Sequence, residues 1–294
     1  MRIAFCYMVH QMSATFVTSI NILSKIGDIL VHVDKRVSLE DFISIKDNVT
    51  FLDNRIAVRW GGFDQIIADI ELLKAADAAG PYDYVFMMSG ECMPIQDNDS
   101  IIKFLEINRG KEFIYADKKS QDINVRLKYR YPHYYSDKNR NICLSAFIVL
   151  CDKIPWFHRN PFLKKNPYFN MLPPLYKGGN WFTISGQCNK YILDYIISNP
   201  NYLIAFKESH CGDEIFFHTL VYNSEFRCKI YEDNTSDIPT SNQLRYIDWK
   251  KGPDFPRILT QEDYPAIKES RCLIARKITD KINLSEFENY FNLK

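Results

Sequence analysis

A short acidic stretch, Cys211–Thr219, combines a turn with the start of an amphipathic helix. Gly212 supplies the turn, Asp213 is a good N-cap, and Glu214 falls in the first turn, where the helix dipole favours an ionised carboxylate. A fixed, ionised carboxylate is what an enzyme needs to take a proton from an alcohol. Taken alone, this stretch favours an ordinary first-turn acid, and a general base is the alternative that the rest of the chain decides.

The C-terminal region carries a second group of chemically capable residues, all of them basic. They are Arg245, Arg257, Arg276 and Lys277. Guanidinium and ammonium groups near one edge of a fold suit a diphosphate, whose charge a metal could otherwise neutralise. The alternative is ordinary surface charge, which explains most single basic residues.

Two groups of residues raise the question of a metal. Residues 97–99 read Asp-Asn-Asp, a pattern that holds a divalent ion in many nucleotide-sugar enzymes. They stand directly before a helix, however, and capping by Asp97, Asp99 or Ser100 explains them. The candidates for zinc are His210, Cys211, Asp213 and His218. Their spacing matches no standard zinc pattern, so we predict no metal site.

The elements that must position these residues begin with a buried strand, a helix and a second buried strand, at 2–9, 13–26 and 28–33. This β-α-β opening predicts a parallel sheet with covering helices, and ligands of such sheets lie at the carboxyl ends of the strands. His10 and Asp34 both fall at these ends. Asp34 could accept hydrogen bonds from a ribose or a base, or could be a strand-end turn residue.

Strand–helix units continue to residue 117, where the composition of the sequence changes. Strands are predicted at 49–52, 56–60, 82–88 and 112–116, and helices at 63–79 and 100–108. Residues 118–140 are polar, aromatic and basic, which fits either a solvated loop or a substrate-binding arm. Beyond them we expect helices at 141–158, 187–198, 261–269 and 284–291, and strands at 180–185, 244–249 and 272–277.

Composition excludes several classes of protein. The formal net charge is +1, whereas a general nucleic-acid binder would show a strong basic excess. The longest apolar run, near 144–151, is well short of a membrane span. The eight cysteines form no CxxC pair, so reduced thiols are the simplest interpretation. The N-terminus looks like a first strand and is too short for a signal peptide.

Eight short segments, spread in order through almost the whole chain, carry a family resemblance. They are His32-Val33-Asp34-Lys35, Trp60-Gly61-Gly62 with Ala68-Asp69, Met88-Ser89-Gly90 with Pro94-Ile95, Met171-Leu172-Pro173-Pro174, Gly178-Gly179-Asn180-Trp181-Phe182, Asp213-Glu214-Ile215-Phe216-Phe217, Ile247-Asp248-Trp249 and Ala275-Arg276-Lys277. By these segments the chain resembles the core-2/I-branching N-acetylglucosaminyltransferase family, which also includes the protein xylosyltransferases.

The resemblance implies a GT-A-like α/β fold, with a mostly parallel central sheet flanked by helices. It divides the chain into a nucleotide-sugar-binding, Rossmann-like half at 1–117 and an acceptor-binding and catalytic half at 118–294, within one compact unit. The implied activity is inverting sugar transfer from a UDP-sugar to a hydroxyl of an acceptor glycan, with no metal or other cofactor. N-acetylglucosamine is the sugar that the family name favours, and xylose or a hexose is the alternative.

The resemblance also assigns roles to individual residues. Glu214 matches the catalytic base, and Arg257 and Lys277 match the pair that holds the diphosphate, with Arg245 as a rival to Arg257. The remaining assignments are His10, Asp34 and Trp60 around the uridine, and Arg126 and Trp249 on the acceptor side. Trp181, like the other tryptophans, offers a flat face to a base or a sugar ring.

One loop departs from the family, and so does the cellular setting. Cys92 stands where the family often has Asp in a Ser-Gly-x-Asp-x-Pro loop, with Glu91 beside it, which bears on the contact with the sugar. Eukaryotic members are anchored in the Golgi and carry disulfides, whereas this chain resembles a soluble bacterial relative. We expect a cytoplasmic enzyme of surface polysaccharide synthesis, with a glycan or lipid-linked saccharide acceptor and room for a peripheral membrane contact. A non-catalytic glycan- or nucleotide-binding relative, or a metal-dependent transferase using Asp97 and Asp99, is the alternative.

Overall fold

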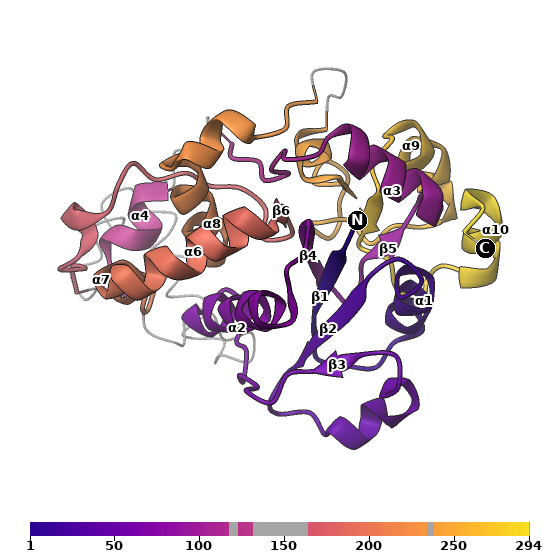
Figure 1. Ribbon diagram of the computed structural model, residues 1–294, viewed down its shortest axis with the longest axis horizontal. Helices are drawn as coiled ribbons and strands as arrows, with labels where there is room; N and C mark the ends of the chain where they lie inside the picture. Colours follow the sequence, from indigo (N-terminus) through magenta and orange to yellow (C-terminus); the bar gives the residue numbers. More distant parts are fainter. Residues whose placement is uncertain (118–122, 132–163, 234–237, 294) are drawn as a thin grey trace.

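The computed structural model describes residues 1–117, 123–131, 164–233 and 238–293. Arg140 and the helix predicted at 141–158 lie outside these residues. The described chain forms two β-sheets with helices packed around them (Figure 1). The predicted α/β class is therefore confirmed, including its mostly parallel central sheet flanked by helices. No helix of the described residues is long and apolar enough to cross a membrane.

The larger sheet has the strand order β3-β2-β1-β4-β6. Its strands are β1 (Ile3–Val9), β2 (Asp28–Val33), β3 (Thr50–Phe51), β4 (Tyr84–Ser89) and β6 (Thr183–Ser185). The first four run parallel, and β6 is antiparallel to β4. Because β6 comes from the second predicted half, 118–294, the sheet is built from both halves of the chain.

The sequence of β1 explains why this sheet is enclosed on both faces. Ala4 and Cys6 belong to the core on one face, Phe5 and Tyr7 to the core on the other, and all four are fully buried. The first face packs against α2 (Phe63–Ala79), α6 (Gly186–Ser198) and α8 (Asp213–Tyr222), and the second against α1 (Ala14–Leu23), η1 (Leu39–Ile45) and α3 (Asn98–Ile107). A strand with alternate residues in two cores is apolar throughout, as the continuous run at 2–9 predicts.

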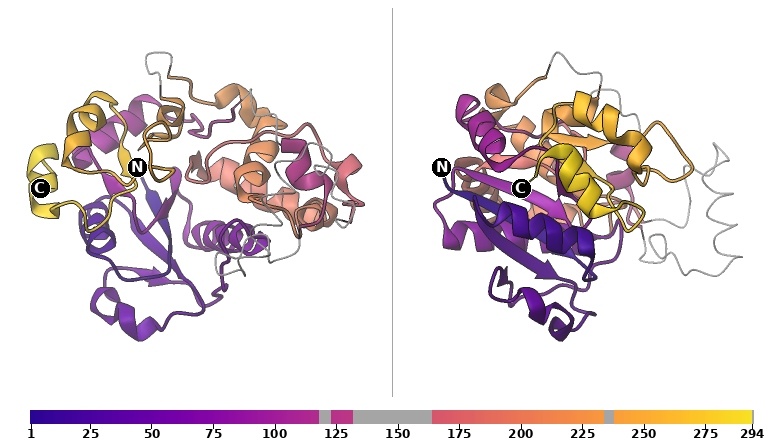
Figure 2. Two further views of the ribbon diagram at one scale, coloured as in Figure 1. Left: turned by 180° about the vertical axis from the view of Figure 1, so that it is seen from behind. Right: turned by 90° about the vertical axis from the view of Figure 1, so that its right-hand side faces the viewer.

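The smaller sheet has the order β5-β8-β7 and gathers the C-terminal part of the chain. Its strands are β5 (Met93–Pro94), β7 (Arg245–Ile247) and β8 (Ile274–Arg276). Residues of α9 (Tyr264–Glu269) and α10 (Leu284–Phe291) pack with this sheet in a third core, and η7 (Gln261–Asp263) precedes α9. Figure 2 shows α10 beside α1, and the two helices are in contact. Since β5 follows the end of β4 by three residues, its pairing with β8 brings the C-terminal Arg276 to the edge of the larger sheet.

Short elements complete the described chain, and two predicted strands are wrong. The short elements are α4 (Ile123–Lys128), η4 (Phe169–Met171), α7 (Pro200–Ala205), η5 (Glu225–Lys229) and η6 (Pro239–Gln243). Residues 56–60 form no strand because side chains of β2 and its following turn take their amides. Residues 112–116 contribute only isolated bridges, at Glu112 and Phe113. The predicted capping of α3 is confirmed, since Asp97 accepts from the Ser100 backbone amide at 2.9 Å and from its hydroxyl at 2.7 Å.

Candidate active site

A cleft of about 570 Å³ lies at the carboxyl ends of β1, β2 and β4. The predicted site residues among its walls are His10, Asp34, Trp60, Trp181 and Arg276. Parallel strands end at one edge of a sheet, which is why residues far apart in sequence meet here. The cleft combines aromatic faces, a carboxylate and a guanidinium, which suits a ligand with both a ring and an anionic group. Their individual roles remain predictions.

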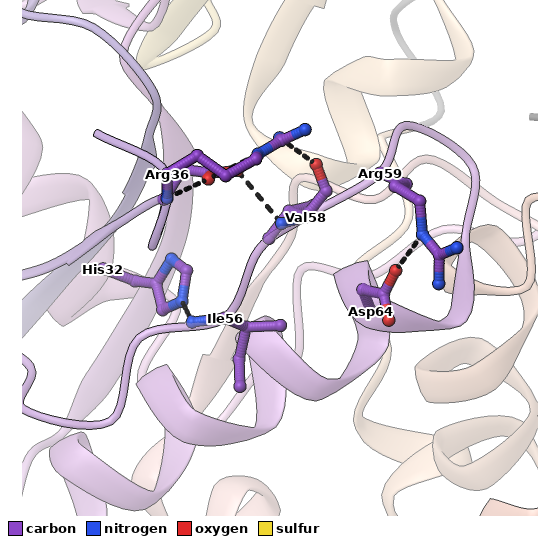
Figure 3. Close-up of polar contacts among 7 residues, drawn as sticks. His32, Arg36, Ile56, Val58, Arg59 and Asp64 are labelled. Carbon is purple, nitrogen blue, oxygen red and sulfur yellow. Dashed lines mark hydrogen bonds and ion pairs between the residues drawn. The ribbon is translucent and has the colours of Figure 1, made fainter. Parts of the chain in front are cut away.

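The wall that carries Trp60 is held in place by two buried side chains of β2 and its following turn. His32 is fully buried, and its Nε2 accepts from the Ile56 amide at 2.8 Å. Asp34 Oδ2 accepts from the Val58 amide at 3.0 Å. Figure 3 shows His32 beside Ile56 and the Arg36 guanidinium reaching Val58. This irregular segment is therefore fixed, and it carries the Trp60 indole, 59% exposed, to the cleft.

Asp34 is already engaged within the protein. Its two oxygens accept four hydrogen bonds, from the Arg36 guanidinium at 2.9 and 2.7 Å, the Arg36 amide at 2.9 Å and the Val58 amide. Burial opposes ionisation, but these bonds prevail and hold the pKa of Asp34 below its ordinary value. Arg36 is more than half exposed and also lines the cleft. Asp34 therefore holds the guanidinium of Arg36, which the sequence analysis does not name, at the cleft wall.

Glu214 does not line this cleft but is connected to it. The Cys211 amide donates to the Gly61 carbonyl at 2.8 Å, and the Trp60 and His210 rings contact each other edge to face. Arg126 donates to Glu214 Oε2 at 2.7 Å, and Lys177 Nζ lies 3.5 Å from the same oxygen. The side chain of Glu214 is 27% exposed, so its carboxylate is compensated by two cations without being enclosed.

The two cations beside Glu214 are one residue that the sequence analysis names, Arg126, and one that it does not, Lys177. Arg126 was expected on the acceptor side, and it contacts the predicted base. Lys177 was not predicted, because nothing in its local sequence distinguishes it from a surface lysine. The Gly178 amide donates to the Glu214 carbonyl at 2.8 Å, which fixes Lys177 beside that helix turn. A Cβ on Gly178 would lie 1.8 Å from the Tyr115 carbonyl oxygen, so this approach requires glycine.

Asp213 differs from its prediction as an N-cap. Gly212 is the N-cap of α8, and Asp213 is the first helical residue, with its carboxylate buried and accepting from Gln65 at 3.1 Å. Burial and the neighbouring Glu214 charge raise the pKa of Asp213 to about 7. Asp69 on α2 is also fully buried, and burial and Asp213 raise its pKa. Asp213, the neighbour of Glu214, and Asp69 are therefore both buried carboxyl groups with a raised pKa.

Arg276 and Lys277 reach the cleft edge from the end of β8. Arg276 Nε donates to Ser89 Oγ at 3.2 Å, and its guanidinium lies 5.5 Å from the centre of the Trp181 ring. Glu91 contacts both cations: its Oε2 is 3.4 Å from Arg276 Nη2, and its Oε1 is 3.4 Å from Lys277 Nζ. Cys92, at the position of the family Asp, is buried instead and does not line the cleft.

Arg257, Trp249 and Arg245 also lie away from the cleft walls. Arg257 Nε donates to buried Asp263 at 3.2 Å, and Trp249 is half exposed just beyond β7. Arg245 is fully buried and donates to the carbonyls of Met87 and Phe182, each at 3.0 Å. An enclosed guanidinium that bonds to the sheet cannot contact a diphosphate in the cleft, so Arg245 is corrected to a residue that joins the two sheets.

The described residues contain no group of three or more His, Cys, Asp or Glu side chains arranged to hold a metal. Asp97 is the first residue of the Asp-x-Asp pattern, and both of its carboxylate oxygens accept hydrogen bonds that cap α3. His218 is fully buried against Phe182, and burial lowers its pKa to about 3. Asp97 therefore caps a helix, and His218 is part of the protein interior.

The fold and the cleft define an α/β protein with a cleft at the carboxyl edge of a mostly parallel sheet. The family model of the core-2/I-branching enzymes matches residues 3–268, and the chain belongs to that family of glycosyltransferases. It is 22% identical over 285 residues to a protein of Ciona intestinalis named xylosyltransferase, covering 90% of this chain and 30% of that protein. It is 23% identical over 269 residues to xylosyltransferase 1 of Rattus norvegicus, covering 85% of this chain and 28% of that protein. The chain thus spans less than a third of the length of either relative.

Proposed function

We propose that this protein transfers a sugar from a UDP-sugar to a hydroxyl of an acceptor glycan, with inversion at the anomeric carbon. The observation that carries this proposal is the arrangement around Glu214. Arg126 donates to Oε2, and Lys177 lies against the same oxygen. Arg126 and Lys177 thereby fix the orientation of the carboxylate, which accepts the proton of the attacking hydroxyl in this proposal.

The leaving group is the second requirement of this reaction. Arg276 lines the cleft and Lys277 adjoins it, so the two can stabilise the departing diphosphate by electrostatic contact, without a metal. Arg257 is also proposed to stabilise the diphosphate, although it lies outside the cleft walls. Trp60 and Trp181 offer faces for the uracil and the sugar.

The identity of the sugar and the acceptor is the finer part of the proposal. The notion of N-acetylglucosamine rests on the family, whereas the two relatives are named xylosyltransferases. We propose N-acetylglucosamine as donor sugar and a surface polysaccharide or lipid-linked saccharide as acceptor, with UDP-xylose or a UDP-hexose as the alternative donor. A bacterial, cytoplasmic setting, at the inner face of the membrane, belongs to the same proposal.

The test is a donor screen that follows UDP release with UDP-N-acetylglucosamine, UDP-xylose, UDP-glucose and UDP-galactose. Saturable release with one donor, raised by an added saccharide acceptor, supports a transferase. Binding of UDP with no release from any donor, across a panel of neutral and acidic oligosaccharides, would favour a non-catalytic nucleotide-binding relative. Loss of release in EDTA, restored by manganese or magnesium, would favour a metal-dependent enzyme.

A further inference from the structure

Glu91 is an acid at the edge of a cleft whose proposed ligand is an anion. It lines the cleft, and its side chain is 26% exposed. One carboxylate oxygen faces Arg276 and the other faces Lys277, each at 3.4 Å. A carboxylate held between two cations has the charge and the acceptor geometry of a phosphate oxygen pair.

The backbone around Glu91 is fixed while its side chain is not enclosed. The Ile278 amide donates to the Glu91 carbonyl at 3.0 Å, and the Glu91 amide donates to Ser89 Oγ at 3.3 Å. The antiparallel pairing of β5 with β8 holds these segments side by side. Both side-chain contacts are longer than the 2.7–2.9 Å typical of a charge-assisted hydrogen bond. The carboxylate can therefore leave the cations by rotation about its side-chain bonds, with no movement of the backbone.

We propose that Glu91 is an internal counter-ion that competes with the diphosphate of the ligand for Arg276 and Lys277. This inference rests on the proposed function for the nature of the ligand. When a diphosphate enters, its oxygens replace the Glu91 carboxylate on the two cations. When the product UDP leaves, the carboxylate returns, so the cations do not remain uncompensated. Glu91 thereby weakens the hold on the product and promotes its release.

The alternative role for Glu91 is to position the two cations for the ligand. The two roles predict opposite changes when the charge is removed. A competitor that is neutralised leaves two cations for the ligand, so anions bind more tightly. A positioning residue that is neutralised releases the cations, so anions bind more weakly. Glu91 forms one ion pair with each cation, and the loss of both pairs predicts a change of roughly tenfold in affinity, which is about 1.4 kcal/mol.

The experiment measures binding of UDP and of inorganic pyrophosphate by calorimetry, at low salt, to the full chain and to Glu91→Gln. Glu91→Asp keeps the charge on a shorter side chain, and Glu106→Gln removes the same charge from the exposed part of α3. We expect Glu91→Gln to bind both anions roughly tenfold more tightly. Glu91→Asp should lie between it and the wild type, and Glu106→Gln should bind as the wild type does. In the transfer reaction, the inhibition constant of product UDP should fall by a similar factor in Glu91→Gln.

The outcomes separate the inference from the proposed function. One outcome is tighter pyrophosphate binding by Glu91→Gln, with no UDP-specific binding by any variant. It would support the role of Glu91 as a counter-ion and refute the proposal that the ligand is a nucleotide. Normal UDP binding by the wild type, with equal or weaker binding of both anions by Glu91→Gln, would overturn the counter-ion and leave the proposed function standing. A melting temperature for Glu91→Gln equal to that of the wild type confirms that the comparison concerns the site.

Discussion

Replacing Asp34 by Asn tests whether this carboxylate holds the cleft wall together. The carboxylate accepts four hydrogen bonds, at 2.7–3.0 Å, from Arg36 and Val58. The single oxygen of an Asn side chain can accept about two of these bonds. The Asn NH2 group would stand opposite other N–H donors, with which it cannot bond. Charge-assisted bonds contribute about 1.5–3 kcal/mol each, but water compensates the exposed Arg36 in part. We therefore expect a loss of about 2–4 kcal/mol in the free energy of unfolding.

The assay is urea denaturation of the full chain, with Asp53→Asn as a control that removes the charge of an exposed Asp. The native pKa of Asp34 is lowered, so its stabilisation is present above the unfolded pKa near 4 and is lost as the pH falls through the native pKa. The difference between wild type and Asp34→Asn should therefore shrink in acid. A difference below about 0.5 kcal/mol at pH 7 would refute the reasoning, because it is the size expected for an ordinary surface site.

Two further predictions concern protons and metals. Burial raises the pKa of Asp213 to about 7, so its proton favours the native state, and the free energy of unfolding should fall as the pH rises from about 4 through 7. Asp213→Asn should flatten that fall in a series of urea melts, and an unchanged slope would contradict the assignment. Transfer activity should survive EDTA, because Arg276 and Lys277 supply the charge that a metal would supply. A loss reversed by manganese or magnesium would show the opposite.

The sequence predicted the parts of the fold that depend on local pattern. The apolar run of β1 depends on local pattern, and β1, α2, α6 and α10 occur close to the predicted ranges. The cleft residues His10 and Asp34 follow from the rule that strand ends meet at one sheet edge. The false strand at 56–60 shows the limit, because the side chains of His32 and Asp34 accept from the Ile56 and Val58 amides.

The rest of the site depends on contacts between distant segments, for which one sequence carries no signal. Arg245 reads as one more basic residue near the C-terminus, and only the packing of β7 against β4 and β6 reveals that it is buried. Lys177 approaches Glu214 because Gly178 allows the two backbones to meet. Glu91 faces Arg276 because β5 pairs with β8 across more than 180 residues of sequence.

The proposed role of Glu214 is the central claim, and one substitution tests it directly. Glu214→Gln keeps the size and most of the hydrogen bonding of the side chain but removes the proton acceptor. Glu225→Gln is the matched control, because Glu225 is also an acid in the first turn of a helical element. General-base catalysis contributes about 10²–10⁴-fold, so turnover by Glu214→Gln should fall by roughly that factor.

The measurement is the single-turnover rate of sugar transfer at saturating donor, together with the dissociation constant of UDP for the same preparation. We expect Glu214→Gln to lose turnover as stated while its UDP affinity and melting temperature stay near those of the wild type, and Glu225→Gln to keep all three. Transfer by Glu214→Gln at the wild-type rate, with normal UDP binding, would show that the base is another residue, and Asp213 would be tested next.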